Sequence, residues 1–260
     1  MVSLPSHLQS LVDALVLARL SGRPIAELDF AQAPSTAGEA YAVDQAVADR
    51  LGWEPLGWKI AGTTVQVREA LGLNAPIYGR IYRRHRHVSP VRLPAAELMT
   101  PMVECEFFVT LGEALPPRKE PYILQDIEDA VATVHAGIEI AELRIPSLPS
   151  PPTTFLLADA SAAGHYIFGP EIDDWKTELR DCPVEVEING EIAARGQSRD
   201  VMGHPLKPLL WLANARSEWG DGLKAGEMIS TGSMTGYVPV ARGDRAVARF
   251  KTKIVDLTLR

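Results

Sequence analysis

Two glutamates that lie one residue apart, Glu104 and Glu106, are the residues of this chain best suited to chemistry. They lie in an apolar run at residues 101–111 whose β-branched and aromatic residues predict a strand. Side chains at positions i and i+2 of a strand share one face, so both carboxylates should point the same way. Two like charges on an apolar strand repel each other and are costly to bury unpaired. A divalent cation would solve both problems, because it supplies positive charge and takes carboxylate oxygens as ligands.

A third carboxylate, Glu139, lies in a similar apolar run at residues 136–143. Three glutamates on apolar strands form a set of oxygen ligands that leaves room for water and substrate. The alternative is a solvent-facing strand, since Glu-X-Glu is common on the exposed face of an antiparallel sheet. The neighbours disfavour that alternative, because Met102 and Phe108 share the face of the first two glutamates. The opposite face is also apolar: Val103, Cys105, Phe107 and Val109.

Three further polar positions could contact a substrate. Lys59, in Gly-Trp-Lys-Ile, could hold a carboxylate or transfer a proton, or it could pack its stem and extend its ammonium group into solvent. The Gly- and hydroxyl-rich run at residues 225–236 predicts a turn, either an anion-binding one or an ordinary tight one. Ser161 follows a predicted strand at residues 154–158, and no histidine stands in an obvious position to activate it as a nucleophile.

The composition indicates an ordinary globular protein. Its 260 residues are 46% hydrophobic and 23% charged, and the net charge of −7 argues against a nucleic-acid partner. The short basic stretch at residues 80–87 predicts an exposed loop. Only two cysteines occur, and Cys105 lies mid-strand, which favours a reduced, cytoplasmic protein. No run is typical of a signal peptide or a membrane-spanning helix, so we expect no membrane partner.

Two amphipathic helices, at residues 6–20 and 37–51, predict an N-terminal helical cap at residues 1–56, which precedes a β-rich catalytic domain at residues 57–260. Asn189-Gly190 predicts a tight hairpin turn. Many strands, few helices and no βαβ alternation indicate an α+β fold. The predicted strands cover residues 57–61, 101–111, 136–143, 154–158, 183–188, 191–195, 226–231 and 245–259. The predicted helices of the second part cover residues 121–134 and 205–219, and a short one follows Thr63.

A series of short motifs from Ala37 onward resembles the hydratase/decarboxylase branch of the fumarylacetoacetate hydrolase superfamily, typified by 2-keto-4-pentenoate hydratase and 4-oxalocrotonate decarboxylase. Each motif is modest alone, but their order and spacing together make the resemblance strong. The motifs are Glu-Ala-Tyr-Ala-Val (39–43), Gly-Trp-Lys-Ile (57–60), Val-Glu-Cys-Glu-Phe (103–107), Gly-Ile-Glu-Ile-Ala-Glu-Leu-Arg (137–144), Ala-Ser-Ala-Ala-Gly (160–164), Gly-His-Pro-Leu-Lys-Pro-Leu-Leu-Trp-Leu-Ala-Asn (203–214) and Gly-Leu-Lys-Ala-Gly-Glu-Met-Ile-Ser-Thr-Gly-Ser (222–233).

This resemblance implies a mixed β-sandwich roll with N-terminal helices, assembled as a homo-oligomer. It also implies a Mg²⁺ or Mn²⁺ ion that is held by Glu104, Glu106 and Glu139 and that chelates a small 2-oxo acid through its keto and carboxylate oxygens. By the same resemblance, catalytic roles fall to Lys59, Asp159 and Ser161. Substrate-binding roles fall to Lys59, Ser161, Thr231 and Gly232.

Two departures from the family pattern affect the expected reaction. Hydratases of this branch read Pro-Asp-Phe-Gly where this chain has Pro-Ile-Tyr-Gly, so Ile77 replaces an acid. They also read Asp-Asn-Ala-Ser where this chain has Ala-Asp-Ala-Ser, which moves the acid to Asp159 and, on a predicted strand, to the other face. We expect hydration through a stabilised enolate first, then 4-oxalocrotonate-type decarboxylation. Acylpyruvate hydrolysis ranks last because no catalytic His–Glu pair is evident, and a non-catalytic 2-oxo acid-binding homologue is the alternative.

Overall fold

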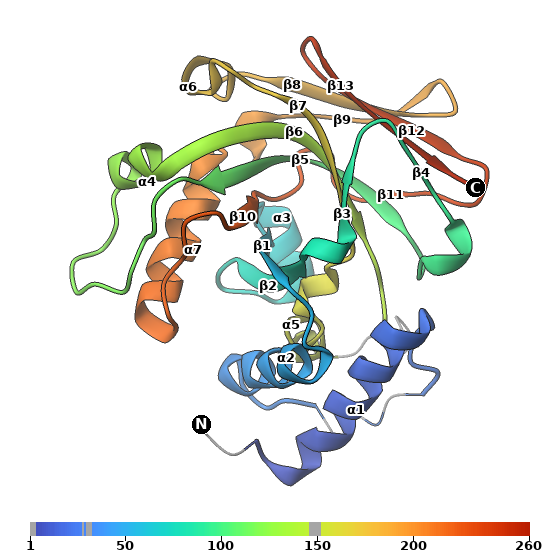
Figure 1. Ribbon diagram of the computed structural model, residues 1–260, viewed down its shortest axis with the longest axis vertical. Coiled ribbons are helices and arrows are strands. Elements are labelled where there is room, and N and C mark those ends of the chain that lie inside the picture. The colour runs from blue at the N-terminus through green and yellow to red at the C-terminus, as the bar shows by residue number, and fades with distance from the viewer. Residues whose placement is uncertain (1–3, 28, 30–32, 146–151) are drawn as a thin grey trace.

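A strongly curved eight-stranded sheet forms the centre of the computed structural model, which describes residues 4–27, 29, 33–145 and 152–260 (Figure 1). The strands run in the spatial order β2, β1, β10, β5, β6, β7 and β3, and β11 also pairs with β5. Their bounds are Pro55–Ala61 (β1), Ile77–Tyr82 (β2), Arg86–Val88 (β3), Met102–Leu111 (β5), Val131–Ala141 (β6), His165–Glu171 (β7), Met228–Ser230 (β10) and Val238–Pro239 (β11). β1 pairs with β10 and β3 with β7 in parallel, and the other pairs are antiparallel, so the sheet is mixed.

A second, five-stranded sheet packs over the first and lies above it in Figure 1. Its order is β4 (Val91–Leu93), β13 (Lys253–Leu259), β12 (Arg245–Phe250), β8 (Pro183–Ile188) and β9 (Glu191–Gln197). Ala246, Ala248 and Phe250, at alternate positions of β12, are buried in the core, and the ring of Phe250 lies 5.4 Å from that of Phe107 on β5. The predicted α+β fold, with two packed sheets and N-terminal helices, is confirmed.

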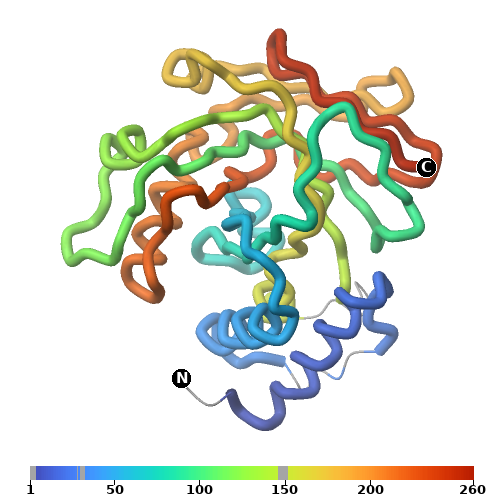
Figure 2. The backbone as a smooth tube through the Cα atoms, in the orientation of Figure 1, coloured from blue at the N-terminus to red at the C-terminus, as the bar shows by residue number. Residues whose placement is uncertain are grey.

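The N-terminal helices pack on one another and on a later helix, below the curved sheet in Figures 1 and 2. These helices are α1 (Ser6–Ser21), α2 (Ala37–Leu51) and α5 (Thr153–Ala158). Thr36 begins α2, since its side-chain oxygen accepts a hydrogen bond from the backbone N–H of Glu39. The predicted helices are therefore present, and the domain boundary after residue 56 stays a prediction.

The remaining helices are short except for one. They are α3 (Val65–Leu71), α4 (Leu124–Ala130), α6 (Trp175–Glu178) and α7 (Leu206–Trp219), with 3₁₀ turns at Arg83–His85, Ala95–Glu97, Ala160–Ala162 and Ser198–Asp200. α7 packs against α4, and its Leu209 and Leu212 are buried in the main core. In the part of the chain that the structure describes, no helix is long and apolar enough to cross a membrane.

The structure corrects four predicted segments and confirms the hairpin. The basic stretch at residues 80–87 is not an exposed loop, because it contains the end of β2, with Ile81 and Tyr82 buried, and the start of β3. Asn189 and Gly190 both have positive φ between β8 and β9, as the predicted turn requires. Residues 154–158 are not a strand but the helix α5, because so short an apolar run carries no periodicity that separates the two. The helix predicted at 121–134 ends at Ala130, since the β-branched residues that follow pair with β5. Residues 245–259 form a hairpin rather than one strand.

Candidate metal centre

The register between β5 and β6 brings the three glutamates together. Glu104 lies directly opposite Glu139, and Glu106 is two residues farther along the same face of β5. The side chains are buried, with residue exposures of 4% for Glu104, 1% for Glu106 and 0% for Glu139. One carboxylate oxygen from each lies within 4.8 Å of the other two. The carboxylates that were predicted to share one inward face therefore form one compact group. We call Glu104, Glu106 and Glu139 the carboxylate cluster.

Hydrogen bonds from neighbouring strands fix the orientation of two of these carboxylates. Ser230 of β10 donates its hydroxyl to Glu106 and also to Oε2 of Glu139, at 3.3 Å. The backbone N–H of Gly232 donates to Oε2 of Glu106 at 2.7 Å. Tyr166, which is opposite Glu139 on β7, donates its hydroxyl to Oε1 of Glu139 at 3.3 Å. Outer partners of this kind hold metal-binding carboxylates in place.

Lys59 of β1 extends into this cluster rather than into solvent. The residue is 2% exposed, and its Nζ atom lies 2.9 Å from Oε1 of Glu139 and 4.0 Å from Oε2 of Glu104. Nζ also donates to the carbonyl oxygen of Ser161 at 3.0 Å. Burial alone would lower the pKa of Lys59, but the carboxylates, above all Glu139, raise it overall. The group therefore stays a cation.

One ammonium group does not balance three carboxylates. Burial raises the pKa of Glu104 to about 7, although Lys59 pulls it down. Burial and the neighbouring Glu139 and Glu104 raise the pKa of Glu106 well above its usual value. Among the described residues, Oε2 of Glu104 is buried without a hydrogen-bond partner. An excess of buried acid with an unpartnered oxygen fits a hard divalent cation, which prefers oxygen ligands.

Thr231 and Gly232 lie beside the cluster and support it through the backbone. The hydroxyl of Thr231 donates to the carbonyl oxygen of Phe107 at 3.1 Å. Gly232 has φ of +101°, and a Cβ atom at this position would lie 2.5 Å from the side chain of Thr63. This turn therefore requires glycine, both for its conformation and for the close approach to Thr63. The turn is present as predicted, and its role toward a substrate stays a prediction.

Ser161 and Asp159 contact groups other than the three glutamates. Ser161 has φ of +55°, and its hydroxyl donates to the carbonyl oxygen of Tyr78 at 3.0 Å. Asp159 follows α5, so the expectation that it lies on a strand with its face reversed is wrong. Its Oδ1 atom lies 2.6 Å from Nε of Arg144 and 3.0 Å from Nη2 of Arg19. Their predicted catalytic roles remain predictions.

Asp159 belongs to a second buried cluster, the arginine cluster, which we define as Arg19, Glu142, Arg144 and Asp159. Glu142 accepts from the backbone N–H of Met99, at 2.9 Å, and lies 3.4 Å from Nη1 of Arg144. A histidine is also near, since Nε2 of His165 lies 3.8 Å from Oε2 of Glu142.

This His–Glu contact was not anticipated from the sequence. Burial lowers the pKa of His165 to about 3, so the imidazole is neutral at ordinary pH. The contact adjoins the arginine cluster and involves none of the three glutamates on β5 and β6.

Ile77 is buried where related hydratases carry an acid. It is 3% exposed and packs with Phe155 and Leu157 of α5. It also lines a cavity of about 660 Å³, together with Tyr78 and Trp211. Most of this lining is apolar.

A small cavity of about 170 Å³ opens directly onto Glu104. α3 and the end of β1 form one side, and the chain between β10 and β11 forms the other. Its lining includes Thr63, Thr64, Val67, Ser233, Met234 and Tyr237. Of the three cavities described here, this is the one that a carboxylate of the cluster lines.

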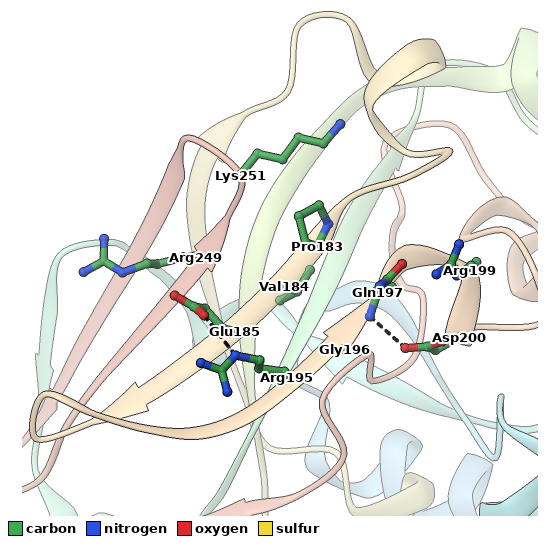
Figure 3. Close-up of a pocket in the computed structure, with 10 residues that line it drawn as sticks. All are labelled: Pro183, Val184, Glu185, Arg195, Gly196, Gln197, Arg199, Asp200, Arg249 and Lys251. Atoms are coloured by element: carbon green, nitrogen blue, oxygen red, sulfur yellow. Dashed lines mark hydrogen bonds and ion pairs between the residues drawn. The ribbon is translucent and has the colours of Figure 1, made fainter.

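A third cavity, of about 600 Å³, lies on the second sheet (Figure 3). Arg195 and Glu185 in its wall form an ion pair at 3.5 Å, whereas Arg249 and Lys251 extend away from each other. Its walls come from β8, β9 and β12 and contain none of the site residues predicted from the sequence. The carboxylate cluster is therefore the better candidate for chemistry.

Two residues of the site were missed by sequence reasoning. Ser230 directly precedes Thr231 within the Gly- and hydroxyl-rich run, so the run was recognised but this hydroxyl was not. Tyr166 left no signal, because its contact with Glu139 depends on the register between β6 and β7.

The fold and the buried carboxylates define the class of a metal-dependent enzyme. Residues 77–259 match the family model of the fumarylacetoacetate (FAA) hydrolase C-terminal domain, and the chain belongs to this superfamily, in its hydratase/decarboxylase branch. It is similar to 2-keto-4-pentenoate hydratase 2 of Dechloromonas aromatica (strain RCB), with 29% identity over 89% of this chain and 88% of that one. It is also similar to 4-oxalocrotonate decarboxylase of Pseudomonas putida, with 28% identity over 83% and 82%.

A solved structure of 4-oxalocrotonate decarboxylase from Pseudomonas putida G7, complexed with calcium and acetate, has the same fold. Its TM-score is 0.88 at 26% identity, covering 100% of this chain and 99% of that chain. A second structure of that decarboxylase, complexed with magnesium and adipate, has a TM-score of 0.86 at 25% identity.

Proposed function

We propose that this chain is a lyase that uses Mg²⁺ or Mn²⁺ and hydrates a small 2-oxo acid presented as its dienol. The observation that carries this proposal is the cluster of three buried carboxylates with a single ammonium group. Glu104, Glu106 and Glu139 would hold the ion. When bound, the ion would polarise the C2 keto oxygen of the substrate and stabilise negative charge that develops there.

Lys59 has the position and charge to hold the substrate carboxylate. Its raised pKa keeps the ammonium group protonated, so we assign it an electrostatic role rather than that of a general base. Its contacts with Glu139 and with the carbonyl of Ser161 fix the direction of the side chain. The turn at Thr231 and Gly232 lies next to the same carboxylates, since the N–H of Gly232 donates to Oε2 of Glu106. We propose this turn as the second support of the substrate.

Hydration is favoured over the other reactions of the branch by the nature of the relatives, among them several 2-keto-4-pentenoate hydratases. Decarboxylation of a 4-oxalocrotonate-type acid is the second candidate, since that decarboxylase is similar over the whole chain. Hydrolysis ranks last, because the contact between His165 and Glu142 belongs to the surroundings of the arginine cluster and involves none of the three glutamates. A homo-oligomer remains our prediction from the family.

The test is a turnover assay of the purified protein with Mg²⁺ against a panel of 2-hydroxydienoates and 2-oxo diacids. We expect hydration of 2-hydroxypenta-2,4-dienoate that is abolished by EDTA and restored by excess Mg²⁺. Release of CO₂ from a 4-oxalocrotonate-type acid would identify the decarboxylase instead. Metal binding without turnover of any compound would favour a non-catalytic 2-oxo acid-binding protein.

Ile77→Asp tests how the chain works without the acid of related hydratases. The variant restores a carboxylate beside β1, and we expect faster hydration of 2-hydroxypenta-2,4-dienoate if that acid relays a proton. Ile77→Asn is the matched control, because asparagine has the shape of aspartate but carries no charge. If the parent protein already hydrates this compound rapidly and Ile77→Asp is no faster, position 77 does not control the reaction.

A further inference from the structure

The cavity at Glu104 has walls that distinguish one kind of substrate tail from another. Val67 of α3 and Met234 present apolar groups to it, whereas Thr63, Thr64 and Ser233 present hydroxyls. Its volume of about 170 Å³ is small beside the cavity of about 660 Å³ at Ile77. We call the keto and carboxylate groups of a 2-oxo acid its head and the remaining carbons its tail. A substrate whose head binds at the carboxylate cluster therefore has little room for its tail.

The charge of this cavity is its most selective property. Among the described residues that line it, Glu104 is the only charged side chain, and none is a lysine or an arginine. The nearest cation on α3 is Arg68, whose Nη1 atom donates to the carbonyl oxygen of Gly62 at 2.7 Å, and Arg68 does not line the cavity. Lys59 is not among the residues that line the cavity, and its Nζ atom is closer to Glu139, at 2.9 Å, than to Glu104, at 4.0 Å.

This arrangement has a cost for a diacid. Three carboxylates, one ammonium group and one divalent cation balance in formal charge, so the head of a 2-oxo acid adds one negative charge to the site. A second carboxylate on the tail would lose water against Val67 and Met234, beside Glu104 and without a cation. A neutral tail has no such penalty and gains apolar contact.

We propose that Val67, Met234 and Tyr237 select the substrate by its tail, so that the site takes 2-oxo acids with one carboxylate and a short uncharged tail and rejects 2-oxo diacids. This inference rests on the proposed function, because it assumes that the substrate head binds at the carboxylate cluster. Tyr237 stands at the mouth, 47% exposed, where its ring limits the length of the tail and its hydroxyl can meet a polar end group.

The experiment compares binding of three probes to the full chain with saturating Mg²⁺, by titration calorimetry. Pyruvate tests the head alone, and 2-oxovalerate and 2-oxoglutarate have the same number of carbons but carry one and two carboxylates. We expect 2-oxovalerate to bind at least tenfold more tightly than 2-oxoglutarate. If none of the three binds, the proposed function fails. If pyruvate and 2-oxovalerate bind and 2-oxoglutarate binds as tightly as 2-oxovalerate, the inference about the tail is wrong.

A variant should reverse the preference. Val67→Arg places a cation in the wall, and we expect it to raise the affinity for 2-oxoglutarate at least tenfold relative to 2-oxovalerate while pyruvate changes little. Val67→Leu is the matched control and should keep the preference of the parent. Met234→Lys is a second variant on the opposite wall, used if Val67→Arg does not fold. A folded cationic variant that shifts both probes equally would overturn the assignment of these walls.

Discussion

Two buried groups of charged side chains among the described residues differ in their balance of positive and negative charge. In the carboxylate cluster, three glutamates face one lysine, and Oε2 of Glu104 has no hydrogen-bond partner among the described residues. In the arginine cluster, two carboxylates face two arginines, and Glu142 and Asp159 both lie within ion-pair distance of Arg144.

The difference separates a site for a ligand from a structural network. Buried charges are tolerated when they are paired and hydrogen-bonded. The arginine cluster balances its charges with its own side chains, although Nε and Nη1 of Arg19 are buried without a hydrogen-bond partner among the described residues. It joins α1 to the segment after α5 through Arg19 and Asp159. The carboxylate cluster lacks this balance, and a divalent cation would supply the missing positive charge. Net imbalance of buried charge, rather than burial itself, is what marks the site.

Removing one carboxylate from the unbalanced cluster should have the largest effect. Glu106→Gln keeps the volume and removes the charge, so we expect turnover to be abolished and Mg²⁺ affinity to fall more than about a hundredfold, beyond the loss typical of outer partners. The fold should persist, as circular dichroism would show. Glu142→Gln, in the arginine cluster, is the control and should leave Mg²⁺ affinity unchanged. Full turnover by Glu106→Gln would refute the assignment of the ligands.

Breaking the balanced cluster should instead reduce stability. Arg144→Met leaves two carboxylates buried with less compensation, and we expect the free energy of unfolding to fall by about 3–5 kcal/mol, measured with denaturant. Arg245→Met, which breaks an exposed ion pair with Asp256, is the control and should cost less than about 1 kcal/mol. Mg²⁺ affinity of the folded Arg144→Met protein should stay within about twofold. A large loss of Mg²⁺ affinity would show that the two clusters are coupled.

Lys59→Met sharpens the role of the single cation in the carboxylate cluster. Loss of one buried charge-assisted contact should cost about 2 kcal/mol, which is roughly thirtyfold in the affinity for oxalate measured with Mg²⁺ bound. Oxalate mimics the enolate of a 2-oxo acid and requires no turnover. Unchanged oxalate affinity would mean that Lys59 does not contact the substrate.

The smallest effect that we predict is the pH dependence of stability. Burial raises the pKa of Glu104 to about 7 and that of Glu106 well above its usual value, so without metal the folded protein binds more protons than the unfolded chain between about pH 4.5 and 7. Its stability should therefore fall as pH rises through that range. The measurement is the Tm in EDTA and in Mg²⁺ at about pH 5.5 and pH 8. Mg²⁺ should raise the Tm more at pH 8, where it competes with fewer protons for the carboxylate of Glu104; an equal rise at both pH values would contradict this.

The local pattern predicted the residues of the carboxylate cluster better than their partners. Period-two spacing places Glu104 and Glu106 on one face, and their apolar neighbours indicated burial. The contacts of Ser230 and Tyr166 depend instead on which strands are neighbours, a property that local spacing does not contain. Asp159 was misplaced for a related reason, since the four apolar residues before it fit a strand as well as a helix.

The position of β10 has a consequence for how the protein is made. β10 comes from the last part of the chain, yet it lies between β1 and β5 and carries Ser230, which bonds to Glu106 and Glu139. A nascent chain that has left the ribosome only as far as β7 contains all three glutamates and Lys59. It lacks the strand that joins β1 to β5, so the lysine and the carboxylates have no common sheet. The complete cluster, with Ser230 and Lys59 beside the three glutamates of β5 and β6, therefore forms only after β10 has been made.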